Sequence, residues 1–148
     1  MPVVLNGFLE KSTELGVSEI IPLKSERTEK QQFRMDRMKG ILESALIQSQ
    51  QVWMPILHEP QYFNSWVEKA QADQKFIAHC EIGKKRKLSE IIETNSSSQL
   101  ILIGPEGDFT DEEIKLAVSH QFEAVELGEN RLRSETAAVA AAVVLKLI

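Results

Sequence analysis

Short runs of apolar residues alternate along the chain with longer segments in which apolar residues recur every three or four positions. The first pattern predicts buried strands, and the second predicts amphipathic helices. Strands are expected at Val17–Leu23, Gln74–Cys80, Leu100–Ile103 and Phe122–Leu127, with a short edge strand at Met54–Leu57. Helices are expected at Gly7–Leu15, 31–50, Leu88–Glu93, from Asp111 to about His120, and Ser134–Ile148, and another begins at Phe63 or Asn64 and runs through Gln71. Strands that alternate with helices predict an α/β fold with a mostly parallel sheet layered by helices.

Local signals mark several of these elements. Gly16 stands where a glycine commonly ends a helix, and Thr110 followed by Glu113 matches a capping box that begins one. The unbroken apolar run Leu100–Ile103 is typical of a strand buried on both faces. The last helix is very rich in alanine and valine, so we expect it to be buried or to pair with a partner.

Composition places the chain among ordinary globular proteins. It has 148 residues, 43% of them hydrophobic, which fits one domain, and no apolar stretch is long enough for a membrane span. Met1–Asn6 lacks the features of a signal peptide, and the single Cys80 fits a reducing compartment, so a cytoplasmic protein is expected. The net charge of −5 argues against global electrostatic binding of nucleic acid. The basic run Lys84–Lys87 is interpreted as a solvated loop, with a local contact to nucleic acid as the alternative.

Two loops that contain glycine carry the candidate chemistry. Gly104–Gly107 follows one predicted strand, and Leu127–Ala137 follows the next and leads into the last helix. Such loops meet at one edge of a parallel sheet and outline a binding site. In the second loop Gly128 lets a ligand approach the backbone, Arg131 and Arg133 supply planar cations, and Ser134 can cap the helix. For each loop the alternative is an ordinary connection with no ligand.

Several familiar sites are disfavoured. Gly104–Gly107 is followed by no Gly-Lys-Ser/Thr and does not form the dinucleotide-binding pattern Gly-x-Gly-x-x-Gly. His79 and Cys80 are adjacent on a strand and point to opposite faces, and no second cysteine or nearby histidine completes a metal site. Ser134 lacks the Gly-x-Ser-x-Gly context of a serine hydrolase. We therefore expect no metal.

Taken together, the motifs resemble the RsmE family. The resemblance rests on Glu10–Leu23, Ser25-Glu26-Arg27, Gln48-Ser49 before Pro55, Leu102–Gly107, and Leu127-Gly128 followed by Leu132–Ala137. It runs through nearly the whole chain in the same order. Members of this family are SPOUT-class methyltransferases that transfer a methyl group from S-adenosylmethionine to N3 of a uridine in small-subunit (16S) ribosomal RNA.

The resemblance implies features that the pattern alone does not. One is a C-terminal trefoil knot, whose loops hold the methyl donor; another is a homodimer with the site at its interface. The donor-binding positions carried over by motif are Ile103, Gly104, Gly107, Leu127, Gly128, Leu132 and Arg133. The implied partners are ribosomal RNA, the small ribosomal subunit and a second copy of the chain.

The chain also departs from the family pattern. Members usually carry an N-terminal PUA-like RNA-binding domain, whereas 1–148 is expected to be the methyltransferase domain alone. Gln51 stands where the family often has arginine after the Gln-Ser pair, and Asn130-Arg131 stands where it often has arginine ahead of Leu-Arg. We therefore expect the donor site to follow the family more closely than the substrate site.

Methylating N3 of uridine requires loss of the imide proton and alignment of the nitrogen with the donor's methyl group. We expect Arg133 to stabilise the negative charge that develops on uracil. Glu135 either orients Arg133 or takes the proton, and the orienting role is favoured because a helix N-terminus stabilises the charged carboxylate. The alternatives are a non-catalytic knot domain that dimerises and binds the donor or RNA without turnover, and an enzyme that acts on another RNA.

Overall fold

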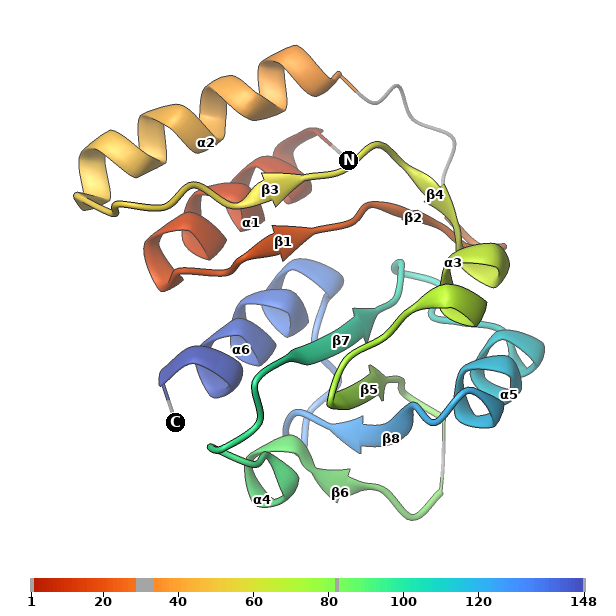
Figure 1. Ribbon diagram of the computed structural model, residues 1–148. Helices are drawn as coiled ribbons and strands as arrows, with labels where there is room; N and C mark the ends of the chain where they lie inside the picture. The colour runs from red at the N-terminus through yellow and green to blue at the C-terminus, as the bar shows by residue number, and fades with distance from the viewer. Residues whose placement is uncertain (1, 29–33, 82, 148) are drawn as a thin grey trace.

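A computed structural model describes residues 2–28, 34–81 and 83–147. The amino-terminal half, with two helices and four very short strands, lies above a four-stranded sheet built by the rest of the chain (Figure 1). The helices are α1 (Pro2–Leu15), α2 (Met35–Ser49), α3 (Phe63–Lys69), α4 (Leu88–Ile91), α5 (Asp111–Ser119) and α6 (Ser134–Leu147). The strands are β1 (Glu19–Ile20), β2 (Leu23–Lys24), β3 (Ile56–Leu57), β4 (Gln61–Tyr62), β5 (Gln74–Ala78), β6 (Arg86–Lys87), β7 (Gln99–Ile103) and β8 (Glu123–Glu126).

Every strand pair in the described part of the chain is parallel. The main sheet has the order β6-β8-β5-β7, while β1 pairs with β3 and β2 pairs with β4. Sequence neighbours such as β7 and β8 are separated by β5 in the sheet, so the connections between them cross over it. The predicted α/β class with mostly parallel pairing is confirmed.

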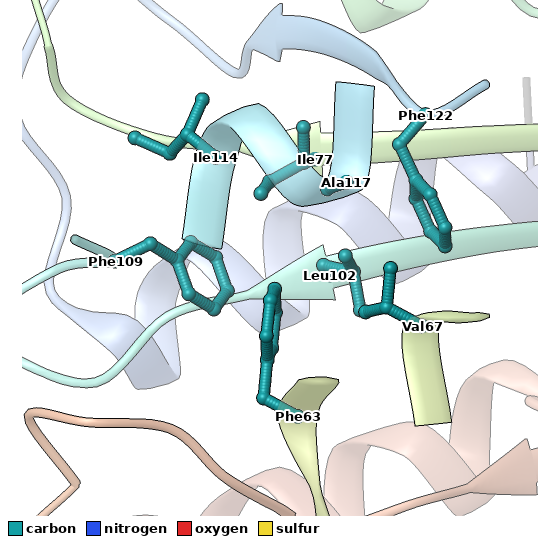
Figure 2. Close-up of a cluster of buried hydrophobic side chains, with 8 residues drawn as sticks. All are labelled: Phe63, Val67, Ile77, Leu102, Phe109, Ile114, Ala117 and Phe122. Carbon is teal, nitrogen blue, oxygen red and sulfur yellow. The ribbon is translucent and has the colours of Figure 1, made fainter. Parts of the chain in front are cut away.

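Both faces of the main sheet are covered, and β5 shows how. Phe76 and Ile77 are adjacent and therefore point to opposite faces, yet they are 1% and 0% exposed. Ile77 belongs to a cluster that the sheet forms with α3 and α5, drawn in Figure 2: Phe63, Val67, Ile77, Leu102, Phe109, Ile114, Ala117 and Phe122. Phe76 packs on the other side with Leu88, Val125 and Ala141, beneath α4 and α6. The sheet is thus a buried central layer, as the apolar runs predict.

The amino-terminal half has its own small core, formed by Leu9, Ile20, Met38, Leu42 and Leu57. It is attached to the rest of the chain where α1 packs on α6. The strand predicted over Val17–Leu23 is divided into β1 and β2, and Pro22, which has no N–H to donate, lies between them. The Pro22 carbonyl still accepts the N–H of Gln61 at 2.9 Å, so the two short strands continue in one direction.

Helix boundaries follow the local signals closely. Gly16 has φ of +80° directly after α1, as its predicted role requires. The capping box at α5 forms in full: the Thr110 side chain accepts the N–H of Glu113, and the Glu113 side chain accepts the N–H of Thr110. α2 begins at Met35, after Arg34 in extended conformation; positions 31–33 of the predicted helix, and Ile148 of the predicted last helix, lie outside the described residues. The basic run predicted as a plain loop contains the short strand β6.

Glu113 also connects distant parts of the chain. It is 5% exposed, and its second carboxylate oxygen accepts the N–H of Glu26 at 3.0 Å. This bond holds the loop after β2 against the start of α5. In the same loop Arg27 Nη1 donates to the Gly107 carbonyl at 2.7 Å. The loop 25–28 is therefore attached to the segment that follows β7.

Replacing Glu113 by alanine should lower the free energy of unfolding by about 2 kcal/mol, because two backbone N–H groups lose their acceptor. Glu113→Gln keeps one acceptor oxygen and should lose roughly half as much. Glu112→Ala removes an exposed carboxylate from the same helical turn and serves as the control. Urea denaturation measures all three variants. Equal stabilities for Glu113→Ala and Glu112→Ala would contradict the bridging role.

A second carboxylate aligns the amino ends of β5 and β7. Asp73 Oδ2 accepts the N–H groups of Ser97 and Ser98, at 2.9 and 3.2 Å, and the Ser97 hydroxyl. These hydrogen bonds, chiefly those from Ser97, lower the pKa of Asp73 below its ordinary value. The serine-rich segment 95–98 is thus attached where the pairing of Gln74 with Gln99 begins.

Candidate functional site

The carboxyl ends of β5, β7 and β8 border a cavity of about 780 Å³. This edge of a parallel sheet is where ligands commonly bind in α/β proteins, and the volume lies within the usual range for small-molecule sites. Three parts of the chain form the walls: 78–81 with Gly83 and Lys85 at the end of β5, 103–106 with Asp108 after β7, and residues between 125 and 137 from β8 into α6. The two loops singled out in the sequence therefore do converge on one place.

The predicted binding residues lie at this cavity, with one exception. Those that line it are Ile103, Gly104, Leu127, Gly128, Leu132 and Arg133. Gly107 does not line the cavity; its Cα faces Arg27, whose side-chain carbons would lie 3.2 and 3.3 Å from a Cβ added at this position. Gly107 therefore makes room for Arg27, which in turn holds the Gly107 carbonyl. Arg131, the other cation of the second loop, also lines the cavity.

Ser134 joins the two loops directly. Its hydroxyl donates to the Gly104 carbonyl at 2.7 Å, across 30 positions of sequence. The sequence predicts that Ser134 caps the last helix, but α6 includes this residue as its first, and the side chain is used for the link between loops instead. At the same helix end the Arg133 carbonyl accepts the N–H of Ala137 at 2.8 Å, which fixes the backbone of Arg133 while its side chain is exposed.

The two glycines at the cavity differ in their surroundings. A Cβ at Gly104 would lie 3.2 Å from the Phe109 ring and 3.4 Å from the Asp108 carboxylate, so this glycine permits tight packing within the protein. A Cβ at Gly128 would meet nothing within 4 Å. Gly128 has no positive φ either, since Gly16 is the only described glycine with one. Neither packing within the protein nor backbone conformation therefore requires a glycine at position 128.

Sequence reasoning missed the third wall of the cavity, at the end of β5. His79 and Cys80 both line it, and the Cys80 N–H donates to Asp108 Oδ2 at 2.8 Å. Lys85 Nζ donates to the His79 carbonyl at 2.5 Å, which folds the following loop back onto the strand end. The available signal was positional: the predicted strand Gln74–Cys80 ends at the same sheet edge as its neighbours, so its last residues belong to the same site.

His79 is held in a setting that disfavours its charged form. Burial lowers the pKa of His79 below the ordinary value of 6.5, the Lys85 cation lowers it further, and the Asp108 carboxylate offsets part of this effect. The folded protein therefore binds this proton more weakly than the unfolded chain does. The resulting stability is fully present above the unfolded pKa and is lost as the pH falls through the folded pKa.

The melting temperature should accordingly fall more steeply in the wild type than in His79→Gln when the pH is lowered from about 7.5 to about 5.5. His120→Gln provides a histidine control outside the cavity and should follow the wild type. Thermal melting followed by circular dichroism at several pH values measures the difference. Parallel curves for the wild type and His79→Gln would show that His79 makes no such contribution.

Glu135 lies apart from the other predicted site residues. It lines a second, mainly apolar cavity of about 310 Å³ between β1–β2, β7 and α6, and it is half-buried there. Within the described residues no ion pair joins Glu135 to Arg133. Its predicted roles, to orient Arg133 or to take a proton, stay predictions.

Metal ligands do not gather at the cavity. Among the described residues no group of three or more His, Cys, Asp or Glu side chains is arranged to hold a metal ion, and Cys80 is an exposed free thiol. In the same part of the chain, none of the helices is both long and apolar enough to cross a bilayer.

Comparison with known proteins identifies relatives along nearly the whole chain. Residues 3–146 match the family model of the RNA methyltransferase domain. A ribosomal RNA small subunit methyltransferase E from Synechocystis is 34% identical over 140 residues, which cover 89% of this chain and 46% of that protein. The chain thus spans about half the length of this relative.

Solved structures agree with the sequence comparison. The ribosomal RNA small subunit methyltransferase E from Neisseria gonorrhoeae, determined bound to S-adenosyl methionine, is 33% identical with a TM-score of 0.86 over 95% of this chain and 59% of its own. A crystal structure from Porphyromonas gingivalis is 30% identical with a TM-score of 0.91 over 99% of this chain and 63% of its own. The resemblance to the RsmE family drawn from the motifs is confirmed. The chain belongs to the family of RNA methyltransferase domains.

Proposed function

We propose that this chain transfers a methyl group from S-adenosylmethionine to N3 of a uridine in small-subunit ribosomal RNA. One observation carries the proposal: two glycine loops from separate strands line a single cavity and are joined by the bond from Ser134 to the Gly104 carbonyl. The names of the relatives, and the donor bound in the Neisseria protein, support both the chemistry and the RNA class. The specificity for N3 of a uridine is inferred from the resemblance to the RsmE family.

The cavity has properties that suit this donor. Its volume of about 780 Å³ fits within the range of sites for ligands of such size. The backbone at Gly104 and Gly128 is accessible at the wall, and Leu127 and Leu132 supply apolar surface. The donor carries positive sulfonium and ammonium groups and a negative carboxylate, and both acidic residues (Glu81, Glu106, Glu126 and Glu129) and basic ones (Lys85, Arg131 and Arg133) line the cavity. S-adenosylmethionine supplies the methyl group when bound.

Arg133 is the group we assign to the chemistry. Uracil loses its imide proton to solvent, and negative charge spreads onto the oxygens beside N3 until N3 attacks the methyl group and S-adenosylhomocysteine leaves. A guanidinium at the cavity, with a fixed backbone and an exposed side chain, can stabilise that charge by donating to one of these oxygens while N3 stays free to attack. For Glu135, at the far side of α6's first turn, we favour the orienting role over proton removal.

We further propose that residues 1–148 form a SPOUT domain with the predicted trefoil knot and act as a homodimer in the cytoplasm, on the small ribosomal subunit. Support for dimerisation comes from α6. Most of its residues are alanine, valine or leucine, yet only Ala141 and Ala142 are buried in the single chain. An apolar helix left half-exposed is suited to an interface with a second copy.

Two measurements test the proposal in sequence. Isothermal titration calorimetry with S-adenosylmethionine should show saturable binding by the wild-type chain. Incubation with labelled donor and small ribosomal subunits should then place label on one uridine, located by mapping the modified nucleotide. Donor binding without product would favour a non-catalytic domain, label on another RNA would favour a different substrate, and no donor binding at all would overturn the proposal.

A further inference from the structure

The loop after β7 contains a backbone conformation that calls for an explanation. Asp108 has φ of +65°, a region that side chains other than glycine adopt at a cost. The other described non-glycine residues with positive φ, Gln50 and Gln121, follow α2 and α5, where helices commonly end in this way. Asp108 follows no helix. It closes a turn in which its N–H donates to the Pro105 carbonyl at 2.9 Å.

The Asp108 side chain compensates for this conformation. One carboxylate oxygen accepts the N–H of Cys80 at 2.8 Å, and the other accepts the N–H of Phe109 at 2.8 Å. The first bond spans 28 positions and reaches the end of β5, whereas the second stays within the loop. Asp108 is also half-buried beside Gly104, where a Cβ would lie 3.4 Å from its Oδ1.

The hydrogen bonds of the Asp108 carboxylate lie just beyond the last residue pair of β5 and β7. The ladder between β5 and β7 ends with the pair Ala78 and Ile103. Beyond this pair the segments that follow the two strands form two walls of the cavity. Asp108 joins these walls beyond the last pair. With its negative charge it is also the acceptor best able to hold a backbone N–H at a fixed distance.

We propose that Asp108 is a positioning residue for donor binding: its carboxylate ties the end of β5 to the loop after β7 and so fixes the cavity between them at the width that the methyl donor needs. This inference rests on the function proposed above. Asp108 lies outside both glycine motifs. Its effect on the donor is indirect, through the two cavity walls that its carboxylate joins.

Two substitutions separate the contributions of the side chain. Asp108→Gly removes the carboxylate and at the same time relieves the positive φ, so the fold should tolerate it. Asp108→Asn retains one acceptor oxygen, and asparagine also tolerates positive φ. Asp111→Asn removes an exposed carboxylate three residues later, away from the cavity, and is the matched control.

Calorimetry with S-adenosylmethionine should show affinity about tenfold weaker for Asp108→Gly and roughly threefold weaker for Asp108→Asn, with Asp111→Asn unchanged. Binding stoichiometry should stay that of the wild type, whereas a variant that merely unfolds would lose stoichiometry. Hydrogen exchange at the Cys80 amide should be at least about tenfold faster in Asp108→Gly.

The outcomes are distinct. Wild-type affinity in both Asp108 variants would overturn this inference and leave the proposed function in place. If Asp108→Gly fails to fold, Asp108→Asn decides alone: weaker binding at full stoichiometry supports the positioning role, and unchanged binding overturns it. A wild-type chain that does not bind the donor would overturn the proposed function, and this inference with it.

Discussion

Arg133→Ala should slow methyl transfer to small ribosomal subunits by about 100- to 1,000-fold, the usual cost of removing one group that stabilises developing charge. The side chain is exposed at the cavity, so its loss leaves no buried group without a partner. The backbone bond between the Arg133 carbonyl and the N–H of Ala137 stays in place. We therefore expect the folded structure to persist and the reaction rate to fall. Single-turnover transfer from labelled S-adenosylmethionine measures this rate.

Two further variants make the result specific. Arg37→Ala removes an exposed arginine from α2, away from the cavity, and should transfer at the wild-type rate. Arg133→Lys keeps a positive charge but loses the planar fork, so it should fall between the wild type and Arg133→Ala. Arg133 also lines the donor cavity, so donor affinity measured by calorimetry should fall in Arg133→Ala, but by far less than the rate, because the main effect is expected in the transition state. Transfer at the wild-type rate by Arg133→Ala would remove Arg133 from the mechanism.

Local features of this fold could be predicted because the residues that determine them are neighbours in sequence. The capping box of Thr110 and Glu113 is an interaction over three positions, and Gly16 ends α1 through its own backbone. The apolar runs likewise predict the central strands, since a run such as Phe76-Ile77 must be buried on both faces wherever the sheet lies. The parallel arrangement then follows from the alternation with helices.

Features that depend on distant contacts could not be predicted in this way. The strand β6 lies in a basic run with no apolar pattern, and its pairing of Arg86 with Val125 is supported by an ion pair between Arg86 and Glu123 at 2.6 Å. A serine at the start of α6 is compatible both with a helix cap and with the observed bond to Gly104. Only the approach of the two loops in space decides between these roles.

Parts of the candidate site that are local in sequence could likewise be predicted, and parts that depend on distant contacts could not. Its two glycine loops could be identified because each is a continuous segment with a distinctive composition. The wall at the end of β5 was missed, because the sequence raises His79 and Cys80 only as metal ligands and rejects them, whereas the sheet register places both at the cavity. Asp108 was missed for a similar reason: its role depends on the N–H of Cys80, 28 positions earlier.

Gly128→Ala should distinguish a ligand-binding glycine from a structural one. A methyl group at this position meets no protein atom within 4 Å and requires no unusual backbone, so the melting temperature should stay within about 2 °C of the wild type. If the donor lies against the backbone here, the same methyl group occupies its space. Overpacking of this kind should weaken donor binding roughly 30- to 100-fold.

Gly104→Ala provides the opposite case. Its methyl group would press on the Phe109 ring at 3.2 Å, so this variant should lose stability as well as affinity. Gly40→Ala is the control, at another open position but on α2. Its donor affinity should equal that of the wild type, and its stability should rise only slightly because alanine has better helix propensity. Thermal melting and calorimetry with S-adenosylmethionine on the three variants measure stability and affinity separately. Wild-type affinity in Gly128→Ala would mean that the donor does not approach the second loop at Gly128, and the assignment of that loop to donor binding would have to be withdrawn.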